Sequence, residues 1–176
     1  QTSALVTGAY GIYFEKTQNS SAFNNTMKTN AESGYGIFID ASFNISMYNT
    51  TINTNGENAY GVYFRRSNSS LFSNGNVTTF GSNSFGAYFA FFSYLNSLYK
   101  TTLRTSEISA SGIYIDAGPY TNISESIINT TGVESYALYT QNSPHLILSR
   151  NSYLTSGSSA SYGIFLSENY NCTIDY

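Results

Sequence analysis

The fold is decided by a five-residue stretch, Tyr10-Gly11-Ile12-Tyr13-Phe14, which the chain repeats to its end. The glycine of this stretch returns at positions 36, 61, 86, 112, 137 (as alanine) and 163, so successive copies lie 25 or 26 residues apart. A period this regular is typical of a solenoid, in which each repeat forms one coil and buries its apolar face only against neighbouring coils. The sequence therefore predicts an all-β solenoid of about seven 25-residue coils, with residues 1–176 forming one domain.

The aromatic residues of the repeat predict a patterned outer surface. Side chains alternate between the two faces of a strand, so we expect Tyr10, Ile12 and Phe14 to point inward. The glycine would then face outward and leave a shallow groove beside a row of aromatic rings. This row, called the outer file below, consists of Tyr13, Phe38, Tyr63, Tyr88, Tyr114, Tyr139 and Phe165. Three roles suit it: contact with a neighbouring molecule, stacking on sugar rings, or cross-strand stabilisation alone.

Polar residues mark the turns between the strands. Gln18-Asn19-Ser20 and Asn55-Gly56-Glu57-Asn58 have the composition of turns, because Asn, Ser and Gly tolerate or satisfy the backbone of such segments. Asparagines recur at one phase of the repeat, and they predict a ladder of side-chain amides that bond from coil to coil: Asn24, Asn49, Asn74 and Asn151.

These features together resemble a known family. The order of Gly-Ile-Tyr-Phe, a Ser/Asn turn, an apolar segment containing Asn and a closing Asn/Gly turn resembles the right-handed parallel β-helix repeats of the pectate-lyase-like superfamily. It is most similar to asparagine-rich surface proteins with NosD-type repeats, and it also resembles archaeal sheath or filament proteins. The resemblance implies a right-handed parallel β-helix. It leaves function open, because this fold serves polysaccharide-cleaving enzymes, adhesins and surface layers alike.

Composition excludes some partners and favours an extracellular location. The net charge of -3, with charged residues at 10%, does not indicate a nucleic-acid partner, and no apolar run is long enough for membrane insertion. Nine N-glycosylation sequons occur where composition alone would give about five. With the few lysines, they predict a glycoprotein at the cell surface. The candidate glycosylation sites are Asn19, Asn24, Asn44, Asn49, Asn68, Asn76, Asn122, Asn129 and Asn171.

The ends of the sequence suggest assembly. Neither end carries a recognisable cap, and an open coil presents an unpaired sheet edge. We expect uncapped ends to stack end to end through Leu5, Val6, Cys172 and Ile174, giving a homopolymer. The alternative is that caps belong to further parts of a longer protein. Cys172 has no partner for an internal disulfide, so it is either a small core residue or an intermolecular link, and the first is favoured.

Candidate chemistry is sparse. Glu15, Asp40, Arg65 and Arg66 fall on neighbouring coils, where paired carboxylates beside arginine suit acid–base work on a sugar. The alternative, which we favour, is a surface ion-pair network. His145 is the single histidine and lacks companions for a metal site, so we expect no metal, no cofactor and no catalytic residue.

The sequence therefore predicts a non-enzymatic extracellular structural protein that assembles with itself into a filament, sheath or surface layer. The alternative is a carbohydrate-binding or carbohydrate-cleaving β-helix, with surface glycans as partners of the outer file. The repeat contains no insertion longer than one residue, whereas enzymes tend to interrupt a repeat with long loops where the site forms.

Overall fold

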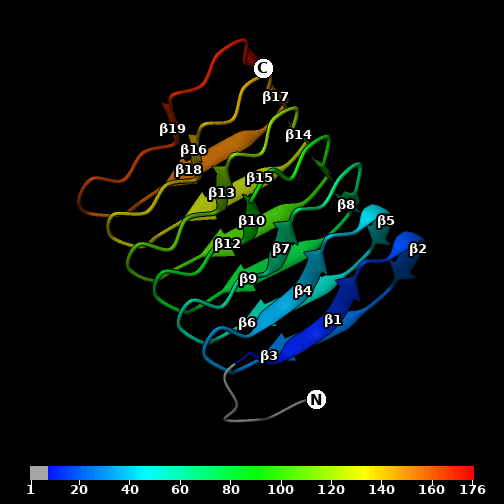
Figure 1. Ribbon diagram of the computed structural model, residues 1–176. Coiled ribbons are helices and arrows are strands. Elements are labelled where there is room, and N and C mark those ends of the chain that lie inside the picture. The colour runs from blue at the N-terminus through cyan, green and yellow to red at the C-terminus, as the bar shows by residue number, and fades with distance from the viewer. Residues whose placement is uncertain (1–7) are drawn as a thin grey trace.

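A computed structural model describes residues 8–176 and shows a stack of coils that rises from the N-terminal to the C-terminal end (Figure 1). Every element in this range is a strand or a turn. The described residues thus contain no helix long and apolar enough to cross a bilayer. Leu5 and Val6, predicted to form part of an end-to-end interface, lie outside the described residues.

Three parallel sheets run along the stack, and each coil contributes one strand to each sheet, except that the last coil adds none to sheet C. Sheet A consists of β1 (Tyr10–Glu15), β4 (Tyr35–Asp40), β7 (Val62–Arg65), β10 (Ala87–Ala90), β13 (Ile113–Asp116), β16 (Leu138–Gln141) and β19 (Ile164–Ser167). Sheet B consists of β2 (Gln18–Phe23), β5 (Phe43–Tyr48), β8 (Leu71–Ser73), β11 (Ser97–Tyr99), β14 (Asn122–Ser124), β17 (Ile147–Ser149) and β20 (Thr173–Asp175). Sheet C consists of β3 (Thr26–Thr29), β6 (Thr51–Thr54), β9 (Asn76–Thr79), β12 (Thr102–Thr105), β15 (Ile127–Thr130) and β18 (Ser152–Thr155).

The register of these sheets follows the sequence repeat. Tyr13 pairs with Phe38, and Phe38 pairs with Tyr63, so equivalent residues of successive coils lie side by side. This in-register stacking of seven coils is the β-solenoid that the 25-residue period predicts, and its strands pair in parallel, as the family resemblance implies.

The core is a column of apolar side chains enclosed by the three sheets. Ile39 from sheet A, Met47 from sheet B and Ile52 from sheet C are all fully buried in it. The rings of Phe64 and Phe89 stack inside with centroids 4.5 Å apart. Like side chains on successive coils thus fill the narrow interior at the density typical of protein cores.

The repeated glycine faces the core, contrary to the prediction that it faces outward. A Cβ on Gly36 would lie 2.1 Å from Cγ2 of Ile52 and 2.7 Å from the carbonyl oxygen of Gly61. The glycine lies at the start of sheet A, just after the chain leaves sheet C, and the alternation is broken there because Gly36 and Ile37 both face the core. Tyr10 and Tyr35, predicted to point inward, therefore lie outside, against the rings of Tyr13 and Phe38.

At the corner between sheets B and C, the coil-to-coil ladder lies one position further along the repeat than the predicted Asn24, Asn49 and Asn74. Asn24, Asn49 and Asn74 are exposed residues with positive φ, where the chain turns from sheet B to sheet C. Asn151 lies one position further along the repeat, where it accepts a hydrogen bond from the backbone N–H of Ser126 at 2.9 Å. Ser126 in turn accepts one from the backbone N–H of Thr101 at 3.1 Å. The coil-to-coil ladder of this corner is thus made by the residues that follow the exposed asparagines.

Candidate functional site

Two parallel rows of aromatic rings cover the outer face of sheet A. The outer file contains the residues predicted from the sequence, and its adjacent ring centroids lie 4.9–5.3 Å apart. Beside it runs a second row, called the flanking file, at the position that precedes the repeated glycine. It consists of Tyr10, Tyr35, Tyr60, Phe85, Tyr136 and Tyr162. The flanking file fills the space in which the sequence predicted a groove.

The flanking file largely conceals the centre of the outer file. Phe38 is 4% exposed and Tyr63 is 6% exposed, whereas Tyr13 at the end of the file is 41% exposed. The guanidinium carbon of Arg65 also lies 4.9 Å from the ring centroid of Phe38, a cation–π contact. Burial raises the pKa of Tyr63 well above its ordinary value, so its hydroxyl stays protonated. The middle of the outer file is therefore a packed cluster rather than an open row of rings.

The flanking file is interrupted in the fifth coil, where Ser111 replaces an aromatic residue. The outer file changes at the same level: the rings of Tyr114 and Tyr139 meet at 63°, whereas the other adjacent pairs of that file stack within 12° of parallel. A missing side chain therefore leaves a space that the neighbouring rings do not close.

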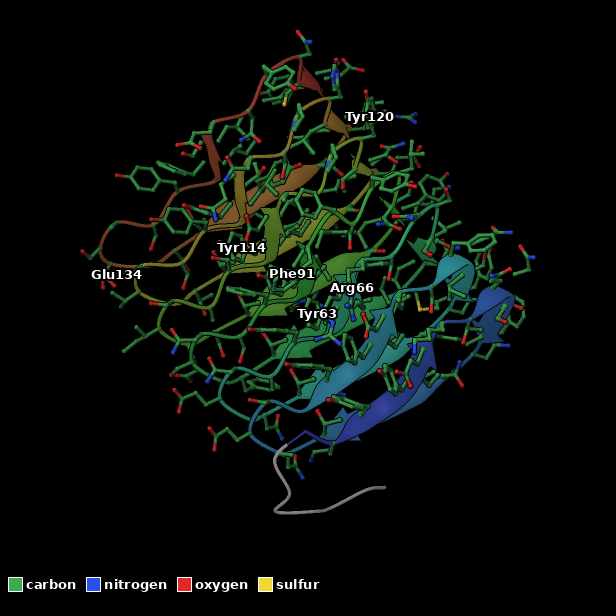
Figure 2. The ribbon with its side chains drawn as sticks, in the orientation of Figure 1. Tyr63, Arg66, Phe91, Tyr114, Tyr120 and Glu134 are labelled. Atoms are coloured by element: carbon green, nitrogen blue, oxygen red, sulfur yellow. The ribbon has the colours of Figure 1, made fainter. Side chains whose placement is uncertain are left out.

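This space is a hollow of about 330 Å³, which we call the Ser111 hollow. Its lining consists of Phe85, Ser109, Ser111, Tyr114, Glu134, Tyr136, Tyr139 and Ala160. Figure 2 shows Tyr114 on sheet A and Glu134 on the turn that leads into the next strand of that sheet. A volume of this size lies at the lower end of the range for small-molecule sites.

Polar groups alternate with the rings around the hollow. Ser111 Oγ accepts a hydrogen bond from the backbone N–H of Tyr136 at 3.2 Å. The hydroxyl of Tyr139 donates to Oε1 of Gln141 at 3.2 Å, and Gln141 Nε2 donates to Oδ1 of Asp116 at 3.1 Å. Burial, together with the nearby charge of Asp116, raises the pKa of Tyr114 to about 12. The hollow thus combines aromatic faces with neutral hydroxyl groups and one carboxylate, Glu134.

The predicted charged cluster is an ion-pair network. Asp40 Oδ2 lies 2.6 Å from Arg65 Nη2, and Asp40 Oδ1 lies 2.8 Å from Arg66 Nη2. Burial alone would raise the pKa of Asp40, but hydrogen bonds from both arginines outweigh it and hold this pKa below its usual value. Glu15 pairs in register with Asp40 and is exposed. A carboxylate held ionised by two guanidinium groups is a poor general acid, so this geometry favours the ion-pair interpretation.

His145 takes part in aromatic packing. Its ring stacks on Tyr120 with centroids 4.6 Å apart. Within residues 8–176, no group of three or more His, Cys, Asp or Glu side chains is placed to hold a metal ion.

The structure separates the predicted sequons by exposure. Asn68, Asn122 and Asn129 are half-buried. The others are exposed, and they are Asn19, Asn24, Asn44, Asn49, Asn76 and Asn171. In one pair of neighbouring coils, Asn44 Nδ2 donates to Asn19 Oδ1 at 2.7 Å. The exposed sequons are the better acceptors on geometric grounds, and their glycosylation stays a prediction.

The remaining predicted interface residues lie in the last coil. Cys172 is half-buried and packs against the core, as expected for a small apolar residue. Ile174 on β20 is exposed.

Comparison with known proteins adds little to this description. No family model matches the sequence, and no curated protein matches it. The structure is similar to a variant of the periplasmic alginate epimerase AlgG, with 15% identity, a TM-score of 0.30, and coverage of 91% of this chain and 47% of that one. It is also similar to an α-1,3-glucanase catalytic domain, with 8% identity, a TM-score of 0.25, and coverage of 86% of this chain and 47% of that one. A surface protein and adhesin of Streptococcus pneumoniae is similar as well, with 7% identity, a TM-score of 0.25, and coverage of 84% of this chain and 67% of that one. The chain spans about half the length of the epimerase and of the glucanase domain.

Proposed function

We propose that this chain is a carbohydrate-binding β-helix, and that the Ser111 hollow takes one sugar ring in place of the missing aromatic side chain. The observation that carries this proposal is the interruption of the flanking file at Ser111, which leaves an aromatic-lined hollow of about 330 Å³. The exposed sequons and the composition are in keeping with a protein outside the cell that meets glycans there.

The spacing of the rings suits a saturated six-membered ring. Phe85 and Tyr136 lie two coils apart, which corresponds to roughly 10 Å at about 4.8 Å per strand. Carbon atoms pack at about 3.5–4.0 Å, so a pyranose fits between two aromatic faces at this separation. The hydroxyl groups of the sugar would then meet the hydroxyls of Ser109, Ser111 and Tyr139 around the edge. Ser111 Oγ accepts from Tyr136 and the Tyr139 hydroxyl donates to Gln141, so the hydrogen of Ser111 and the oxygen of Tyr139 keep capacity for a sugar hydroxyl, which a purely apolar ring would not use.

The hollow favours binding over cleavage. Glycoside hydrolysis ordinarily uses two carboxylates placed on either side of the scissile bond. Glu134 is the single carboxylate among the residues that line the Ser111 hollow. The ionised Asp40 is held by Arg65 and Arg66 and does not line it.

The test compares two tyrosines of the flanking file. Tyr136 lines the hollow and Tyr162 does not, although their rings stack on each other at 5.7 Å. A glycan array identifies ligands of the native protein, and calorimetry then measures affinity for the variants. Tyr136→Ala removes about 50 Å² of apolar contact, so we expect roughly tenfold weaker binding, and Tyr162→Ala serves as the control with little change. Equal losses in both variants, or no ligand on the array, would contradict the proposal.

A second candidate is a structural protein that assembles with copies of itself. One turn favours it: Phe91, Phe92 and Leu95 between β10 and β11 are exposed, Phe92 to 77%. Such an apolar patch is unusual on a protein that remains monomeric. Assembly end to end stays a prediction.

Sedimentation and electron microscopy test this second candidate. We expect concentration-dependent association of the native chain and its loss in Phe92→Ser, with Ile108→Ser, at another exposed apolar position, as control. A native chain that stays monomeric at high concentration would rule out assembly through this turn.

A further inference from the structure

The charges around the Ser111 hollow have one sign. Glu134 lines it, and Asp116 is joined to the lining residue Tyr139 through Gln141. None of the seven Lys and Arg residues, all within the described chain, contributes to this lining.

Four of the basic residues form ion pairs away from the hollow. Arg65 and Arg66 both bind Asp40 on earlier coils of sheet A. Lys100 and Arg150 both bind Glu125, at the corner between sheets B and C. Arg104 on β12 makes no ion pair within residues 8–176, and it lines a different hollow with Thr78 and Asn129. Glu134 is therefore the single charged residue in the lining of the Ser111 hollow.

Glu134 also has room to reach a ligand. It occupies a corner with positive φ, at the same phase of the repeat as Ser109 one coil before and Ala160 one coil after. The backbone N–H of Glu134 donates to the carbonyl of Ser159 at 2.9 Å, which fixes the start of the side chain. Because the residues on either side of it are small, the carboxylate is not covered by its neighbours along this edge.

We propose that the Ser111 hollow selects a sugar that carries a protonated amino group, that it disfavours a sugar with a carboxylate, and that Glu134 determines this specificity. The inference rests on the proposed carbohydrate binding and adds the class of sugar. A carboxylate about 5 Å from the ligand amine attracts it, and the same carboxylate repels an acidic substituent at that position. At the dielectric constant of water this attraction corresponds to roughly fourfold in affinity, and it grows as the ligand excludes water from the hollow.

The experiment uses three ligands that differ in one substituent: glucosamine, glucose and glucuronic acid. Their dissociation constants for the intact native chain are measured by NMR titration at pH 6 and low salt, where the amine is protonated and the carboxylate ionised. We expect glucosamine to bind at least fourfold more tightly than glucose, and glucuronic acid to bind at least fourfold more weakly than glucose. Added salt reduces both differences, because it screens partly exposed charges.

Two variants test whether Glu134 causes the differences in affinity among the three sugars. Glu134→Gln keeps the size of the side chain and removes its charge, so the three ligands should bind it within twofold of one another. Glu107→Gln, at a carboxylate outside the lining of the hollow, is the matched control and should keep the native order. The thermal midpoint of both variants is expected to stay at the native value, since neither carboxylate makes an ion pair within residues 8–176.

The outcomes separate this inference from the function on which it rests. If none of the three sugars binds and the glycan array is empty, the proposed function fails. If glucose binds and glucuronic acid binds equally well, carbohydrate binding stands and the charge selection is wrong. If the native order persists in Glu134→Gln, the assignment of specificity to Glu134 is wrong.

Discussion

Gly36 lies at the corner between sheets C and A, with the side chain of Ile52 directly inside it. The contact explains why an aromatic-glycine pair recurs in the repeat: the aromatic residue joins the flanking file outside, and the glycine lets the coil close tightly on its core. The close packing of this corner thus depends on the absence of a side chain at Gly36. At Ser111, the absence of an aromatic ring likewise opens the Ser111 hollow.

A methyl group at Gly36 should therefore destabilise the protein. Its Cβ would meet Ile52 and the backbone of Gly61, and overpacking of this kind costs about 1–3 kcal/mol. Gly163→Ala is the control, because the nearest atom to its Cβ would be 3.9 Å away, an ordinary contact. Chemical denaturation of the two variants measures the difference, and equal stability would show that the corner has more space than described.

Asp40 is the second residue with a strong individual effect. Its pKa is lower in the folded protein than in the unfolded chain, so its contribution to stability is present in full above the unfolded pKa of about 3.9. That contribution is lost as pH falls through the folded value. Asp40→Asn removes the negative charge and replaces one of the two oxygens that accept from Arg65 and Arg66 with an NH2 group, and we expect it to cost about 1–3 kcal/mol at pH 7.

The pH dependence provides the check for Asp40. Thermal midpoints of the native protein and of Asp40→Asn should differ at pH 7 and converge as pH drops below about 4. A difference that stays constant down to pH 2 would mean that the ionised carboxylate is not what stabilises the native protein.

The corners form the next level of organisation. Besides the ladder between sheets B and C, buried hydroxyls follow the turn from sheet A to sheet B: Ser93 Oγ accepts a hydrogen bond from the backbone N–H of Ser67 at 3.2 Å, and Ser143 Oγ accepts one from Gly118 at 3.0 Å. Each of these bonds joins a turn to the next coil, so the turns, like the strands, are hydrogen-bonded along the stack.

Removal of one such hydroxyl should weaken the solenoid locally. Ser93→Ala leaves the buried N–H of Ser67 without its acceptor, which costs about 1–3 kcal/mol. Hydrogen exchange should report faster exchange at Ser67 in this variant, while Ser21→Ala on the exposed side of β2 leaves protection unchanged. Unchanged protection of Ser67 would mean that water or another group replaces the lost hydroxyl.

The strands and their register could be predicted from the sequence, because the spacing of the repeat brings Tyr13 beside Phe38 on adjacent coils in any parallel solenoid. The direction of Tyr10 could not, since the alternation of β1 is broken at its start, where Gly11 and Ile12 both face the core. The asparagine prediction is confirmed for Asn151, which bonds to the coil before it, and wrong for the other three. Asn49, for example, provides the positive φ of the turn, and the adjacent Thr50 is the buried residue.

In the sequence, the only sign of the Ser111 hollow is a departure from the repeat at Ser111. Ser111 precedes Gly112 where five other coils have Tyr or Phe before the glycine and one has Tyr before alanine. The sequence alone did not reveal the hollow, because the position before the glycine was expected inside the core, where a smaller residue would leave no surface feature. Glu134 was equally hidden, since its approach to the hollow depends on the path of a turn.

On the scale of the whole molecule, sheet A presents one aromatic face that is closely packed in its early coils and hollowed at Ser111. Its early coils carry Arg65 over the packed ring of Phe38, and its later coils carry the open Ser111 hollow, which Glu134 lines. A regular scaffold of this kind holds its rings at fixed spacing, so a ligand need not order the site when it binds.

The most direct test of this account is proton NMR of a sugar ligand in the presence of the native protein and of Ser111→Tyr, which completes the flanking file. The account predicts upfield shifts and broadening of the sugar ring protons with the native protein, because they lie over the faces of Phe85 and Tyr136, and no change with the variant. Equal shifts with both proteins would contradict it, since the sugar would then bind outside the Ser111 hollow.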